Sequence, residues 1–130
     1  MVSVPKFLLR KLYVKGTLQS TGQAVTFRLR NTLGSGYAEE MLPISFDGED
    51  MPMESCFFSS EGESRCFDQV SKAEPFCLLM NRETIITVKN VNLTQEAHTI
   101  GMGFRVPGLG MLRFDFVDLP SSGSKSEGPV

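Results

Sequence analysis

Apolar and polar residues alternate in three segments of the chain. In the first of them, Val25, Phe27 and Leu29 are separated by polar residues. Alternation of this kind places one face of a strand on a core and the other face in water. We therefore predict three strands that each bury one face, and they span residues 25–30, 99–106 and 111–117.

Six further segments are rich in strand-forming residues, and turn signals separate them. Asp47-Gly48 and Pro107-Gly108 are pairs that accept a positive φ or preset a turn. Strands about 8 to 12 residues apart, each followed by a turn signal, are typical of a sandwich or barrel. The six segments are residues 8–18, 37–46, 56–58, 66–70, 76–80 and 84–90.

These patterns predict an all-β fold, namely a two-sheet antiparallel β-sandwich of the immunoglobulin-like type with little or no helix. No window keeps apolar residues at helical spacing without an intervening Gly or Pro, and residues 68–74 offer one or two turns at most. We place the sandwich domain at residues 1–119. Residues 120–130 are almost entirely polar, so we expect a disordered tail there.

Length and charge restrict the partners. A chain of 130 residues fits one domain, and its 13 basic and 15 acidic residues nearly cancel without forming a basic cluster. Nucleic-acid binding relies on clustered Lys and Arg, so we expect no nucleic-acid partner. We see neither a signal sequence nor an apolar run of 18 residues, which predicts a soluble, cytoplasmic protein without a transmembrane segment. A secreted form that has lost its leader would look the same.

The chain has three cysteines, Cys56, Cys66 and Cys77, without the close pairing of a zinc site. We therefore predict no metal and no cofactor in this chain. Free thiols in a reducing compartment are the favoured interpretation. If the protein is secreted, a bridge between Cys56 and Cys66 that closes a hairpin is the alternative.

His98 is the only histidine, so any scheme with an activated nucleophile must use it. In such a scheme Glu96 or Asp115 would orient the ring, and Cys66 or Cys77 would be the nucleophile. The favoured interpretation is non-catalytic: His98 begins a strand, and its ring bonds to a loop carbonyl. We predict no catalytic residue in this chain.

The strand and hairpin that follow His98 carry our candidates for contact with a protein partner. Two glycines on the outward side of a strand let another surface approach closely, although a bulge or bend explains them equally well. A leucine at a hairpin tip more often packs against another surface than remains exposed to solvent. The alternative is that such apolar groups belong to a core in which the seven methionines fill gaps. The candidates are Gly101, Met102, Gly103, Arg105, Pro107, Gly108 and Leu109.

A strand that ends in Asp47-Gly48, followed later by Leu93, His98 and Ile100, resembles the small β subunit of bacterial C-glycoside deglycosidases. In that family the loop before the histidine contains Pro-Gly, where this chain has Gln95 and Glu96. The similarity in order and spacing covers residues 8–118.

This resemblance implies a non-catalytic β-sandwich subunit of a hetero-oligomer. Its partner would be a larger (β/α)-barrel catalytic subunit that holds the catalytic residues and a divalent metal. The complex would be a lyase of carbohydrate metabolism that cleaves the C–C bond of a 3-oxo C-glycoside.

Two other functions remain open. The chain could be a structural β-domain of another large assembly, such as a soluble domain docked on a membrane complex. It could also be a carbohydrate-binding module, but such modules stack sugars on exposed aromatic rings, and this chain has no Trp and only Tyr13 and Tyr37.

Overall fold

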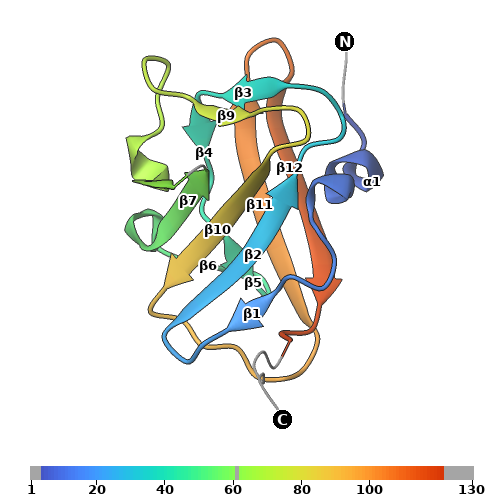
Figure 1. The fold of residues 1–130 in the computed structure, drawn as a ribbon, viewed down its shortest axis with the longest axis vertical. Helices are drawn as coiled ribbons and strands as arrows, with labels where there is room; N and C mark the ends of the chain where they lie inside the picture. Colours follow the sequence, from blue (N-terminus) through green and yellow to red (C-terminus); the bar gives the residue numbers. More distant parts are fainter. Residues whose placement is uncertain (1–3, 61, 122–130) are drawn as a thin grey trace.

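The computed structural model describes residues 4–60 and 62–121. Two antiparallel sheets face each other, and a two-stranded ribbon crosses one end of the sandwich (Figure 1). The first sheet has the order β1 (Gln19–Ser20), β2 (Ala24–Arg30), β10 (Glu83–Lys89), β7 (Cys56–Ser60) and β8 (Glu63–Cys66). The second has the order β12 (Gly110–Asp118), β11 (His98–Val106), β5 (Ser45–Phe46) and β6 (Glu49–Asp50), and β4 (Glu40–Met41) also pairs with β11.

The remaining elements are short. The ribbon consists of β3 (Gly36–Ala38) and β9 (Phe76–Leu78). The helical turns are α1 (Lys6–Leu9), η1 (Arg10–Leu12), η2 (Met53–Ser55) and η3 (Phe67–Gln69). The predicted antiparallel β-sandwich with little helix is therefore confirmed.

A series of aromatic rings connects the two sheets through the ribbon. Phe58 on β7 lies 4.6 Å from Phe76 on β9, measured between ring centroids. Phe76 in turn lies 6.2 Å from Phe104 on β11, and Phe104 lies 6.4 Å from Phe114 on β12. Offset and edge-on rings at these distances pack favourably, and burying each ring contributes roughly 1.5–3 kcal/mol. The core thus extends from the first sheet under the ribbon to the second sheet.

The strongest patterns predicted their strands correctly. On β2 the alternating residues Val25, Phe27 and Leu29 are buried, and β2 pairs with β10 along its whole length. The long strands β11 and β12 form a hairpin paired from His98 opposite Asp118 to Val106 opposite Gly110. These segments bury one face, so a shift of one residue would expose the core face.

Three weaker predictions were wrong. Residues 8–18 begin as helical turns because Leu8, Leu9 and Leu12 lie at helical spacing after Pro5, and the latter two leucines are buried. Of residues 66–70, only Cys66 belongs to a strand, as the last residue of β8, and Phe67–Gln69 form the helical turn η3. Residues 37–46 are divided among β3, β4 and β5, and Pro43, which has no backbone N–H, lies in the last break.

The segment after α1 covers the side of the sandwich between the edge strand β12 and strand β2 (Figure 1). The Arg10 Nε donates to the backbone oxygen of Asp115 on β12 at 2.7 Å. Tyr13 stacks on Phe116 with 3.7 Å between the centroids, and its hydroxyl donates to Asp118. Burial and this carboxylate raise the pKa of Tyr13. The long edge strand is therefore covered by the chain itself.

At the other end of the chain, only part of the predicted tail lies in the described residues. The Ser121 N–H donates to Leu18 at 2.7 Å, and Ser121 bridges Gln19, whereas residues 122–130 lie outside the described part. No helix in residues 4–60 and 62–121 is long and apolar enough to cross a membrane.

Candidate functional site

The predicted contact residues on β11 do not all face outward. Met102 points into the core and is buried, and Gly103 is buried as well. Gly101 is half-buried, whereas Arg105 is exposed and forms an ion pair with Glu40 at 2.9 Å. The strand therefore offers a partner only part of the surface that its sequence indicated.

The two glycines of β11 make room for the chain's own β4–β5 segment. A methyl group on Gly103 would lie 2.7 Å from Leu42 Cδ1 and 3.1 Å from the backbone oxygen of Leu112. A methyl group on Gly101 would overlap the Ser45 hydroxyl. The close approach predicted for these glycines is therefore present within this molecule, and contact with a partner at this strand stays a prediction.

A shallow cavity of about 470 Å³ lies beside these glycines on the outer face of the second sheet. Side chains of both signs line it, including Lys6, Arg113, Asp50 and Asp115. The Asp115 carboxylate is bound by Arg10 at 3.3 Å. Mixed charges of this kind define no single class of ligand.

The predicted hairpin tip lies at the end of the sandwich where the ribbon crosses. Pro107 and Gly108 are exposed, and the backbone there closes a turn in which the Leu109 N–H donates to Val106. Leu109 itself is half-buried and packs against the core. Its side chain lines a second cavity, of about 320 Å³.

This second cavity is apolar. Its walls come from elements far apart in the sequence, and among the described residues that line it none carries a charge. The apolar lining residues are Val4, Leu9, Leu12, Leu33, Ala38, Leu78, Phe104, Val106, Leu109 and Leu112.

A buried asparagine fixes the mouth of the apolar cavity. The Asn31 Nδ2 donates to Gly34 and Leu78 backbone oxygens at 2.6 and 2.8 Å. Its Oδ1 accepts the N–H groups of Leu33 and Gly34. These four hydrogen bonds hold the 31–36 loop against β9. They occupy the donors and acceptors of the Asn31 amide, so the side chain offers no free polar group to a ligand.

Exposed apolar side chains lie on the two segments that pair at this end of the sandwich. Leu33 and Tyr37 line the apolar cavity, whereas Leu79 lines a separate pocket beside Arg65 and Arg82. Of the seven large apolar residues that are exposed in the described part of the chain, four lie on the two segments that meet here. Leu33 is 42% and Tyr37 50% exposed, and on the paired segment Leu79 is 46% and Met80 49% exposed. We call these four residues, together with the apolar cavity, the apolar end.

Sequence reasoning found only Leu109 and its hairpin in this surface. The signal for the rest was available in part, because Leu78, Leu79 and Met80 are three consecutive apolar residues, and a strand buried on one face cannot bury all of them. Leu33 was a second signal, because a large apolar residue between turn residues lies at the surface and indicates a contact there.

His98 is bound on both sides of its ring. Its Nδ1 lies 2.6 Å from the Asp47 carboxylate, and its Nε2 lies 3.1 Å from the Thr94 backbone oxygen. The bond to a loop carbonyl was predicted, whereas the bond to Asp47 was not. Asp47 also accepts the N–H of Thr99 at 2.9 Å. The carboxylate raises the pKa of His98, and the imidazole lowers the pKa of Asp47. The ring thus joins the β5–β6 hairpin to the start of β11.

The two cysteines proposed as nucleophiles for a catalytic His98 lie on other elements of the fold. The Cys66 thiol contacts the Met53 backbone oxygen at 3.4 Å, and burial raises its pKa, which disfavours the reactive thiolate. Cys77 is exposed on β9, in the ribbon. All three cysteines are free, and the described residues contain no group of three His, Cys, Asp or Glu side chains that could hold a metal ion.

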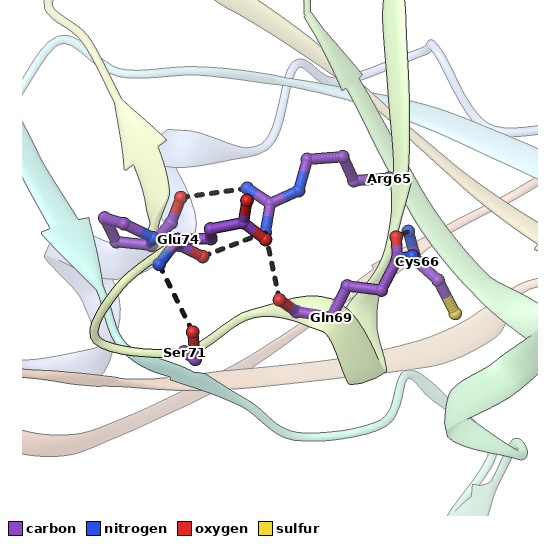
Figure 2. A network of polar contacts seen from close by, with 6 residues as sticks. Arg65, Cys66, Gln69, Ser71 and Glu74 are labelled. Atoms are coloured by element: carbon purple, nitrogen blue, oxygen red, sulfur yellow. Dashed lines mark hydrogen bonds and ion pairs between the residues drawn. The ribbon is translucent and has the colours of Figure 1, made fainter.

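Arg65 fixes the loop beside β8. Its guanidinium donates to the backbone oxygens of Gln69, Glu74 and Pro75 at 2.9 to 3.2 Å, and Figure 2 shows it reaching across to this loop. The Glu74 N–H binds the Ser71 hydroxyl. These bonds satisfy carbonyls of the segment before β9, so we assign Arg65 a structural role.

The fold and the site define an antiparallel β-sandwich domain with an uncharged cavity at one end. Residues 8–119 match the family model described as the hydroxymethylglutaryl-CoA reductase N-terminal domain. Because this match covers most of the sequence, the chain belongs to that family. No curated protein matches the chain significantly in sequence.

The resemblance to C-glycoside deglycosidase β subunits is therefore wrong, because the matching family is a different one. The residues that carried it serve needs of the fold. Asp47 and Gly48 both adopt positive φ in a two-residue hairpin, and Leu93 and Ile100 are buried. The expected barrel subunit with a divalent metal rested on the same resemblance and is not retained.

Proposed function

We propose that this chain is a non-catalytic β-sandwich domain that docks through its apolar end on a larger catalytic domain or subunit. Family membership supports the catalytic portion of a hydroxymethylglutaryl-CoA reductase as that partner. The observation that carries the proposal is an uncharged cavity lined by the exposed Leu33 and Tyr37, with two more exposed apolar residues on the segment that pairs beside it.

Physical chemistry supports docking at this end. Exposed apolar residues that gather over a pocket mark interaction surfaces, whereas single ones do not. Association would remove Leu33, Tyr37, Leu79 and Met80 from water, and a stable interface buries about 800 Å² on each partner. The hairpin tip with Pro107 and Gly108 would lie at its border.

Co-expression with the catalytic portion of a hydroxymethylglutaryl-CoA reductase from the same source tests the proposal. We expect a stoichiometric complex by size-exclusion chromatography with light scattering, and we expect Leu33→Asp with Met80→Asp to abolish it. Val117→Asp is the matched control, because Val117 is also exposed but lies near the far end of β12.

Two outcomes contradict the proposal. One is that the two chains elute separately at concentrations of about 10 µM, where an interface of standard size should be populated. The other is that the Val117 control weakens the complex as much as the changes at the apolar end. In that case another face of the sandwich holds the partner.

A further inference from the structure

We propose that the apolar cavity receives one uncharged side chain of the docking partner, of the size and kind of leucine, methionine or phenylalanine. This inference rests on the proposed function, since it specifies what enters the apolar end. It predicts a single anchor residue at the centre of the interface.

The lining of the cavity determines the chemistry of the anchor. Leu9, Leu12, Phe104 and Leu112 form part of the wall, and among the described lining residues there is no charged side chain. A charged anchor would lose its hydration here without gaining a counter-charge. An apolar side chain loses no hydrogen bond on entering, and its removal from water favours binding.

The volume determines the size of the anchor. At about 320 Å³ the cavity lies at the low end of the range for small-molecule sites, which is roughly 300–1,000 Å³. It can hold one large apolar side chain, but it is too small for a helix. The exposed apolar residues that line the cavity, Leu33 and Tyr37, would then flank the anchor and exclude water.

The mouth is formed before binding. Asn31 holds the 31–36 loop by four hydrogen bonds, and the Ser35 hydroxyl accepts the Met80 N–H at 2.8 Å. Little conformational entropy is therefore lost when the anchor enters, which increases affinity. The half-buried Leu109 forms one wall from the hairpin tip, so a larger residue at this position can occupy the cavity.

The first experiment probes the cavity of the isolated chain. We expect N-acetyl-L-leucinamide and N-acetyl-L-phenylalaninamide to cause saturable shifts in the methyl NMR signals of Leu9, Leu12, Leu109 and Leu112. We expect no such shifts with the α-amide of N-acetyl-L-aspartate. Absence of saturable shifts with both apolar probes, or equal shifts with the charged one, overturns the inference.

The second experiment uses the complex with the reductase catalytic portion. Leu109→Trp should fill the cavity and weaken binding at least tenfold, because burying an apolar side chain of this size contributes about ten- to hundredfold in Kd. Val117→Trp adds the same indole at an exposed position near the far end of β12 and should bind normally. A melting temperature for each variant shows that the domain is folded.

The outcomes separate the inference from the proposed function. If Leu33→Asp with Met80→Asp abolishes the complex but Leu109→Trp binds with unchanged Kd, the docking surface is correct and the anchor is refuted. If no complex forms with any variant, the proposed function fails. The methyl titration then decides alone whether the cavity accepts an uncharged apolar side chain.

Discussion

Gly103 should resist replacement because the chain itself occupies the space beside it. An added methyl group would lie 2.7 Å from Leu42 Cδ1, 3.1 Å from the Leu112 backbone oxygen and 3.2 Å from Arg113 Cγ. Crowding of this kind in a packed region costs about 1–3 kcal/mol. Alanine recovers roughly 0.5–1 kcal/mol of backbone entropy in a strand. The expected net loss for Gly103→Ala is therefore about 1–2 kcal/mol.

Gly101 offers the matched comparison on the same strand. Its added methyl group would meet only the Ser45 side chain, whose hydroxyl can rotate away about χ1. We expect Gly101→Ala to change the free energy of unfolding by less than about 1 kcal/mol. The difference between the two glycines thus depends on the groups that crowd Gly103, of which Leu42 is the nearest and the Leu112 backbone oxygen is the least able to move.

Urea denaturation of both variants measures these free energies, and thermal melting provides a second measure. A loss of 1–2 kcal/mol corresponds to roughly 3–10 °C in Tm for a domain of this size. Leu42→Ala should relieve part of the crowding, so the double variant with Gly103→Ala should show a coupling energy above about 0.5 kcal/mol.

Two results would refute this reasoning. Gly103→Ala could leave the isolated chain as stable as the original, which would mean that the neighbouring groups make room for the methyl group without cost. Alternatively, the Leu42 and Gly103 changes could prove strictly additive, and then Leu42 is not the group that crowds the added methyl.

Three further predictions concern polar side chains that hold the fold together. The pKa of His98 is raised above 6.5, so its pairing with Asp47 contributes fully to the stability of the folded chain below pH 6.5. This contribution is lost as the pH rises through the raised pKa. The pKa of Asp47 is lowered below 3.8, so at the acid end the contribution is lost only as the pH falls through that lowered pKa. Asp47→Asn removes the carboxylate but keeps a residue that tolerates the positive φ, so backbone strain does not add to the effect. The Tm of this variant should fall furthest below that of the original chain near pH 4–6.5, and the difference should shrink above that range. A difference that does not depend on pH contradicts the pairing. Arg65→Lys should cost about 1–2 kcal/mol in urea denaturation and speed amide exchange in residues 67–75, because a single ammonium nitrogen cannot occupy both guanidinium nitrogen positions from which Arg65 reaches the three carbonyls. Unchanged exchange would show that the loop does not depend on Arg65. Asn31→Leu should cost about 2–4 kcal/mol, since it leaves the buried backbone groups around it without partners, and the loss of Tm should exceed that of the exposed Asn92→Leu control.

The sequence by itself determined the sandwich and its main hairpin. Strict alternation in β2, β11 and β12 decides which face is buried, because neighbouring side chains of a strand point to opposite sides. The Asp47-Gly48 turn was equally clear, since both residues tolerate the positive φ that a two-residue hairpin requires. These features depend only on residues close together in the chain.

Only the tertiary structure decided which groups contact the outward-facing residues of the strands. The glycines of β11 face Leu42 and Ser45, which no local pattern could reveal. The cavity at the apolar end is formed by the first helical turns, β9 and the β11–β12 hairpin, which lie up to about a hundred residues apart in the sequence. Local patterns specify which side of a strand is apolar, but the docking surface arises only where distant segments meet and leave apolar groups uncovered.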